Sequence, residues 1–120
     1  MKGEADAVKV LLEYGADLDD QNNDGNTPLH LAAIKGEAAA IELILEYYAD
    51  VDVKNSEGNT PLHLAAIKGK ANTVKLLLKH ANIGVNAKNN EGMTPLDCAN
   101  KNDHQEVAEL LLAHGSLAHS

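Results

Sequence analysis

The stretch GNTPLHLAAIKG occupies residues 25–36 and occurs again, unchanged, at residues 58–69, so that the two copies start 33 residues apart. A third, diverged version, GMTPLDCANKND, follows at residues 92–103. A catalytic motif is usually needed once, whereas a unit that stacks on copies of itself must present the same faces repeatedly. The chain is therefore expected to be an array of short repeats.

Each unit begins with residues that favour a tight turn and then the start of a helix. The units open NNDGNTP, NSEGNTP and NNEGMTP, in which Asn and Gly tolerate positive φ and Thr-Pro supplies an N-cap and a first helical residue. The Thr-Pro pairs are Thr27 and Pro28, Thr60 and Pro61, and Thr94 and Pro95. The first helix is expected to end at Gly36, Gly69 or Asp103, and a second helix with aliphatic residues at helical spacing follows. Each helix spans about ten residues or fewer and would not persist alone in water, so the units must stack.

This combination of features resembles the ankyrin repeat, a unit of one β-turn and two helices with a T-P-L-H-x-A core. The resemblance covers nearly the whole chain and is carried by TPLHLAA, the glycine after it, the leucine-rich second helix and GAD at residues 15–17. It implies an all-α fold, a right-handed ankyrin-repeat solenoid of stacked antiparallel helix pairs whose β-turns project as fingers from one edge. The single domain divides into a half repeat at 1–21, repeats at 22–54 and 55–88, and a C-terminal capping repeat with its tail at 89–120.

The spacing after the second helices departs from this pattern in two places. Tyr48 stands where glycine is expected after a second helix, as at Gly15 and Gly115, so that helix end is expected to be remodelled. The repeat at 55–88 carries one extra residue near Ile83 and Gly84. We therefore expect the loop before the last finger to be displaced.

The two ends of the chain differ in how they would cover the stack. In the last unit Asp97 replaces the histidine and Asn100 replaces an alanine, and polar residues on that outward face fit the cap that a solenoid needs. Residues 3–14 instead resemble a second helix without its first, which would leave Val8 and Leu11 less covered. This favours a piece of a longer array, and it leaves open a partner or self-association at residues 3–14.

The composition narrows the classes of partner. The net charge is −8 and every positive side chain is a lysine, so the chain lacks the arginine fork and the basic face typical of nucleic-acid binding. No run approaches the roughly 20 apolar residues that cross a bilayer, and the N-terminus has no hydrophobic signal region. The one cysteine, Cys98, cannot form an intrachain disulfide, which fits a reducing compartment. The sequence predicts a soluble, cytoplasmic or otherwise intracellular protein with no nucleic-acid partner and no membrane insertion.

Reactive side chains are present, but they form no recognised catalytic or metal-binding pattern. Equivalent positions in stacked repeats lie about 8–10 Å apart, so His30 and His63 could hardly share a zinc ion whose ligands sit about 2 Å away. The resemblance implies instead that these histidines bond to turn backbone and tie one finger to the next. Cys98 could be drawn as a nucleophile, but it matches Leu31 and Leu64 in the repeat and is expected to face inward. No catalytic residue, cofactor or metal is predicted.

Proteins similar to this one usually bind partners on the concave side, which the finger tips and the exposed ends of the first helices form. Carried over residue by residue, the predicted partner-binding positions are, on the fingers, Asn23, Asp24, Asn26, Ser56, Glu57, Asn59, Asn90, Glu91 and Met93, and, on the helices, Ile34, Lys35, Ile67, Lys68, Lys101 and Asn102.

Three features of this surface indicate what it would bind. Ile34 and Ile67 are aliphatic residues on an otherwise solvated face, next to Met93 of the adjoining finger, as in the anchors of an interface. One tip position is acidic in every repeat, and a row of lysines runs parallel to it on the helices. These features favour a protein segment with aliphatic anchors and basic residues, although the charges could equally serve only to keep the solenoid soluble.

The sequence therefore predicts a non-enzymatic protein–protein interaction module that binds a protein partner on its concave surface. The alternative is a structural fragment of a longer array that associates through its uncapped N-terminal end, which a concentration-dependent mass would reveal. An enzyme is the third and weakest reading, because neither a pocket nor a reactive constellation is evident.

Overall fold

The computed structural model describes residues 21–47, 51–79 and 83–118, and their regular structure is helical. The helices are α2 (Pro28–Lys35), α3 (Ala38–Tyr47), α4 (Pro61–Lys68), α5 (Ala71–Leu78), α6 (Pro95–Lys101) and α7 (Gln105–Ala118). The predictions for the half repeat, for residues 3–14 and for Tyr48 fall on residues outside this part of the chain. They stay predictions.

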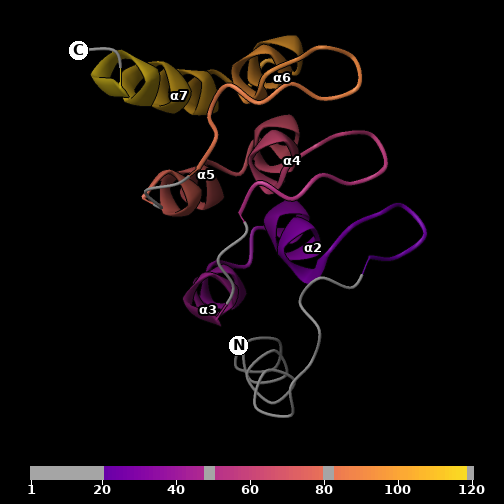
Figure 1. The fold of residues 1–120 in the computed structure, drawn as a ribbon. Coiled ribbons are helices and arrows are strands. Elements are labelled where there is room, and N and C mark those ends of the chain that lie inside the picture. The colour runs from indigo at the N-terminus through magenta and orange to yellow at the C-terminus, as the bar shows by residue number, and fades with distance from the viewer. Residues whose placement is uncertain (1–20, 48–50, 80–82, 119–120) are drawn as a thin grey trace.

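The helices pack as three successive pairs, α2 with α3, α4 with α5 and α6 with α7 (Figure 1). Helices α2, α4 and α6 contact one another in order and form one layer, here called the first-helix layer. Helices α3, α5 and α7 form the second-helix layer in the same way. The predicted all-α stack of helix pairs is confirmed. None of the helices in the described ranges is long and apolar enough to cross a membrane.

Local sequence sets the start of each helix in the first-helix layer. Thr27, Thr60 and Thr94 are N-caps in extended conformation, and each hydroxyl accepts a hydrogen bond from the backbone N–H three residues later. The side chain of that later residue in turn accepts a hydrogen bond from the backbone N–H of the threonine, which completes a capping box. Helices α2 and α4 end at Gly36 and Gly69 in left-handed conformation. Turn, cap and helix are thus decided within about a dozen residues of each repeat.

Helix α7 is longer than the sequence predicts. It runs for 14 residues and passes through Gly115, so the expectation of about ten residues or fewer is wrong for this helix, as is the placement of its end at Gly115. A glycine inside a helix costs only about 1 kcal/mol relative to alanine. Gly115 therefore does not end α7.

The core between the layers is aliphatic, because the chain has no Trp and no Phe. Ala32, Ala65 and Ala99 occupy one equivalent position on α2, α4 and α6, and each is buried. Small side chains at this position let neighbouring first helices approach closely. The larger buried side chains fill the space towards the second-helix layer and include Leu29, Ile41, Ile44, Leu62, Val74, Leu77 and Val107.

Three fingers project beside the first-helix layer, at residues 22–26, 55–59 and 89–93 (Figure 1). Each is closed by a backbone bond from its first N–H to its last C=O, at 2.9–3.0 Å. Neighbouring fingers are also joined, because Ser56 N–H donates to Asp24 O at 3.1 Å and Asn90 N–H donates to Glu57 O at 3.0 Å. The fingers therefore form a continuous wall that is held together by backbone hydrogen bonds.

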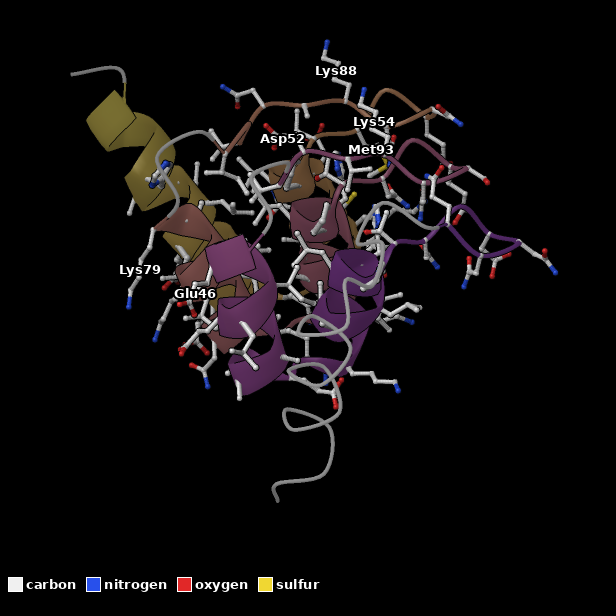
Figure 2. All side chains as sticks on the ribbon, turned by 60° about the horizontal axis from the view of Figure 1, so that its bottom comes forward. Glu46, Asp52, Lys54, Lys79, Lys88 and Met93 are labelled. Atoms are coloured by element: carbon white, nitrogen blue, oxygen red, sulfur yellow. The ribbon has the colours of Figure 1, made fainter. Side chains whose placement is uncertain are left out.

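Lysines precede the second and third fingers. Lys54 donates from Nζ to Lys88 O at 3.2 Å, so the residues that directly precede these two fingers are joined by a hydrogen bond. Figure 2 shows Lys54 and Lys88 on the same side as Met93, apart from Glu46 and Lys79 of the second-helix layer. The loop that holds the extra residue is tied in a similar way, because Gly84 N–H donates to Asp52 Oδ1 at 2.9 Å.

Candidate functional site

One buried histidine in each of the repeats at 22–54 and 55–88 connects that repeat to the finger that follows. The Nε2 atom of His30 lies 2.9 Å from Asn59 O, and that of His63 lies 2.8 Å from Met93 O. A carbonyl oxygen only accepts, so Nε2 carries the proton and Nδ1 is free to accept. Nδ1 does accept from the Thr27 and Thr60 backbone N–H groups, both at 3.1 Å. These contacts are those of a structural cross-link between fingers.

Burial lowers the pKa of His30 and of His63 below the ordinary value of 6.5, although their backbone acceptors oppose this shift. Protonating Nδ1 would also place an N–H against the N–H of Thr27 or Thr60, two donors in one contact. Both imidazoles are therefore held in their neutral form at physiological pH.

These lowered pKa values predict that the protein loses stability on mild acidification. The unfolded chain binds protons at its histidines from about pH 6.5 downwards, while folded His30 and His63 resist protonation until lower pH. The stabilisation is complete above about pH 6.5, and below it falls by up to about 1.4 kcal/mol per pH unit for each histidine. Urea unfolding followed by circular dichroism at about pH 7.5 and about pH 5.5 measures the loss.

The control for this measurement is the His30→Gln, His63→Gln double variant, which keeps the other four of the six histidines. The variant should lose less stability than the parent over the same pH interval. Equal losses in parent and variant would show that these two histidines do not control the acid sensitivity.

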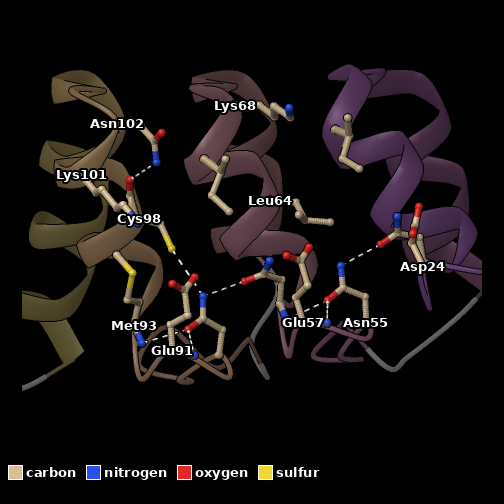
Figure 3. Close-up of a pocket in the computed structure, with 15 residues that line it drawn as sticks. Asp24, Asn55, Glu57, Leu64, Lys68, Glu91, Met93, Cys98, Lys101 and Asn102 are labelled. Carbon is tan, nitrogen blue, oxygen red and sulfur yellow. Dashed lines mark hydrogen bonds between the residues drawn. The ribbon is translucent and has the colours of Figure 1, made fainter.

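An open groove of about 400 Å³ lies between the fingers and the first-helix layer. It is lined by Asp24, Asn26, Ile34, Asn55, Glu57, Asn59, Leu64, Ile67, Lys68, Asn89, Glu91, Met93, Cys98, Lys101 and Asn102 (Figure 3). Most of the positions predicted from the sequence are therefore brought together along one groove that spans all three described repeats. We refer to it below as the groove.

Four predicted positions do not line the groove. Asn23 and Lys35 are exposed elsewhere, and Ser56 and Asn90 belong to the contacts between fingers. The side chain of Asn90 donates from Nδ2 to Ser56 O at 3.0 Å, so it binds the neighbouring finger and not the groove. Asn23, Ser56 and Asn90 were included because they sit at finger tips, and Lys35 because it ends a first helix. A tip side chain can turn to a neighbouring finger instead of the groove, as that of Asn90 does.

Sequence reasoning missed four residues that do line the groove. Leu64 lies one helical turn before Ile67 and Lys68, so its spacing could have placed it on the same face. Cys98 has the same relation to Lys101 and Asn102, which also line the groove. Asn55 and Asn89 open their fingers and carry no local sign that their side chains point to the groove side.

The floor of the groove is apolar. Ile34, Ile67 and Met93 are half-buried, while Leu64 and Cys98 are buried. The prediction that the Cys98 position faces inward in every repeat is wrong for Leu31, which is 39% exposed while Leu64 is 6% exposed. Burial, followed by the charge of Asp97, raises the pKa of the Cys98 thiol, which makes it a poor nucleophile.

The two rims of the groove carry opposite charge. Asp24, Glu57 and Glu91 line it from the fingers, and Lys68 and Lys101 line it from α4 and α6. Figure 3 shows Glu57 and Glu91 on the finger side and Lys68 and Asn102 on the opposite side, with Leu64 and Cys98 between them. In the part of the chain that the structure describes, no group of three or more His, Cys, Asp or Glu side chains could hold a metal ion. The groove is suited to binding a segment with apolar and charged groups.

Comparison with known proteins agrees with this architecture. A family model described as ankyrin repeats (3 copies) matches residues 48–119, and one described as ankyrin repeats (many copies) matches residues 11–65. A search among curated proteins found no match. The first match covers more than half of the chain, and it includes two of the three described helix pairs and two of the three fingers. On this evidence the chain belongs to the ankyrin repeat family.

Proposed function

We propose that this protein is a non-enzymatic binding module that holds a segment of a partner protein in the groove. Ankyrin repeats are generally protein–protein interaction modules, and the groove is the surface to which we assign that role. The observation that carries the proposal is the half-buried apolar line of Ile34, Ile67 and Met93 between an acidic and a basic rim. Half-buried aliphatic residues inside a polar rim have the composition of interface anchors.

The reactive side chains support a binding role over catalysis. His30 and His63 are fully buried and use both ring nitrogens in structural hydrogen bonds, so neither reaches a substrate. Cys98 is a free buried thiol whose raised pKa keeps it protonated. A buried free thiol also fits a reducing, intracellular compartment.

The test replaces the two isoleucines of the groove with glutamate, as Ile34→Glu with Ile67→Glu. Each substitution places a charge where a partner's apolar side chain would dock, so we expect binding to fall by at least about tenfold. The parent and the variant are used to capture proteins from a cell lysate. The protein that the parent retains in the largest amount is then purified, and its Kd is measured for the parent and for the double variant.

Leu112→Glu is the matched control, because Leu112 is 54% exposed on α7 and does not line the groove. This variant should bind as the parent does. Circular dichroism establishes that all the proteins keep their helices. If the double variant and the control bind the purified partner as tightly as the parent, the groove is not the binding site.

A further inference from the structure

The side-chain amide oxygen of the first asparagine in each finger accepts hydrogen bonds from backbone N–H groups of the same finger. Asn22 Oδ1 accepts from the N–H groups of Asp24 and Asn26, at 2.9 and 3.0 Å. Asn55 and Asn89 repeat this arrangement with the third and fifth residues of their own fingers, each bond at 3.0 Å. Because N–H groups require an oxygen acceptor, these amides cannot be flipped. Their Nδ2 groups must therefore point away from their own turns.

These Nδ2 groups fix a second set of amides. Asn55 Nδ2 donates to Asn26 Oδ1 at 2.8 Å, and Asn89 Nδ2 donates to Asn59 Oδ1 at 2.9 Å (Figure 3). The oxygen atoms of Asn26 and Asn59 thus face the next finger along the stack. Their own Nδ2 groups therefore point away from the next finger. These two Nδ2 groups occupy equivalent positions in successive repeats. In the third finger Met93 occupies this position, so it carries no amide there.

The Nδ2 groups of Asn26 and Asn59 donate to no acceptor within the described ranges. Asn59 is only 5% exposed, and both residues line the groove. A buried N–H group without a partner costs about 1–3 kcal/mol, which a ligand with a suitably placed acceptor would recover. The groove therefore contains two donors at repeat spacing that lack an acceptor among the described residues.

We propose that Asn26 and Asn59 donate from Nδ2 to backbone carbonyl oxygens of a partner segment that lies along the groove in polyproline II conformation. This inference rests on the proposed function and specifies the form of the partner. An α-helix is a poor occupant, because the carbonyl oxygens along its length are already used in its own hydrogen bonds. The carbonyl oxygens of a polyproline II segment have no internal partner and are free to accept.

The repeat spacing selects between the two extended conformations. Equivalent positions in neighbouring repeats lie about 8–10 Å apart, the usual distance between packed helix axes. Three residues of polyproline II rise about 9.3 Å and complete one turn, so every third residue faces the same way. Three residues of a β-strand also rise about 10 Å, but they end on the opposite face. Only the polyproline II segment presents the same face to successive repeats.

The charges and the apolar floor of the groove indicate which type of side chain this segment carries at each position of a triplet. Basic residues at every third position would face the acidic rim of Asp24, Glu57 and Glu91. Aliphatic residues at an adjacent position of the triplet would then contact Ile34 and Ile67 on the floor. The expected motif is a repeated triplet with one basic, one aliphatic and one proline residue.

The probe is a labelled peptide of four Pro-Leu-Lys triplets, compared with a peptide of the same composition in which the prolines, leucines and lysines form three blocks. Fluorescence anisotropy gives the Kd of each peptide for the parent. We expect the triplet peptide to bind at least about tenfold more tightly, since only its spacing matches the repeats. Equal affinities would overturn the proposed register.

The decisive variant is Asn26→Asp with Asn59→Asp, which keeps an oxygen for Asn55 and Asn89 but replaces the free donors with acceptors. If the donors bind carbonyl oxygens, the triplet peptide should bind about tenfold more weakly. If the groove attracts lysines by charge alone, the two added carboxylates should strengthen binding instead. Unchanged or tighter binding by this variant overturns the proposal.

Two further measurements keep the result interpretable. Asn26→Asp alone is measured beside the double variant, because Asn26 is only half-buried and its replacement is not expected to disturb the fold. Weaker binding by this folded single variant supports the proposal even if the double variant unfolds. If the parent ignores the triplet peptide but binds a purified partner through Ile34 and Ile67, the polyproline II assignment fails and the proposed function stands.

Discussion

Replacing His63 with alanine is expected to lower the free energy of unfolding by about 3 kcal/mol. The side chain is fully buried and bonds to Thr60 on its own repeat and to Met93 O on the next finger. Alanine would leave a cavity and would strand the Thr60 N–H and the Met93 carbonyl without partners. Urea unfolding at pH 7.5 measures the change. The helical circular dichroism signal is followed because the chain contains no Trp whose fluorescence could report unfolding.

Asp97→Ala is the matched control, since Asp97 occupies the equivalent position in the last described repeat. Asp97 completes the same capping box through its bond to Thr94 N–H at 3.1 Å, but it is exposed and no bond joins it to another finger in the described residues. Loss of this cap should cost about 1 kcal/mol. If the two alanine variants lose similar stability, the histidine contributes only its cap, and the bond between fingers contributes nothing measurable.

Replacing Gly58 with alanine is expected to lower the free energy of unfolding by a similar amount, about 3 kcal/mol. Gly58 has φ of +77°, a conformation that costs any residue with a Cβ about 1–2 kcal/mol. An added Cβ would also lie 2.7 Å from Asn90 N, a backbone atom that cannot move aside alone. The third finger would have to shift, and its bond from Asn90 N–H to Glu57 O would weaken.

Gly92→Ala separates these two causes. Gly92 has φ of +76° at the equivalent position of the third finger, but apart from its own chain neighbours no described residue lies within 4 Å of a Cβ built there. This variant should lose only the conformational part, about 1–2 kcal/mol. Thermal or urea unfolding of both variants would give the difference. Equal losses would mean that the contact between fingers tolerates the extra methyl group, and that the finger wall is looser than the structure indicates.

The sequence predicted the parts of this fold that depend on contacts within one repeat. Thr-Pro fixed each N-cap and first helical residue, and glycine fixed the ends of α2 and α4. These features require only a few consecutive residues, so they repeat wherever the letters repeat. The length of α7 was mispredicted, because a glycine inside a helix costs only about 1 kcal/mol relative to alanine and does not by itself end the helix.

The groove was predicted in outline and not in detail. The alignment of repeats placed Ile34, Ile67 and the acidic tip residues on one surface, because equivalent positions in a stack share a face. It did not separate Asp24, which lines the groove, from Asn90, which bonds to the neighbouring finger. The direction of a turn side chain depends on the finger beside it, which no single repeat contains.

The repeating unit of this protein can be read from its sequence, whereas the surroundings of each copy depend on how the repeats stack. Leu31 and Leu64 belong to the same dodecapeptide, yet Leu31 is 39% exposed and Leu64 is 6% exposed. Helix α4 packs between α2 and α6, so its copy of the unit has a described helix pair on each side. The amides of Asn26 and Asn59 likewise take their orientation from the finger that follows them. Local chemistry repeats with the sequence, whereas burial and hydrogen-bond partners depend on the place of each copy in the stack.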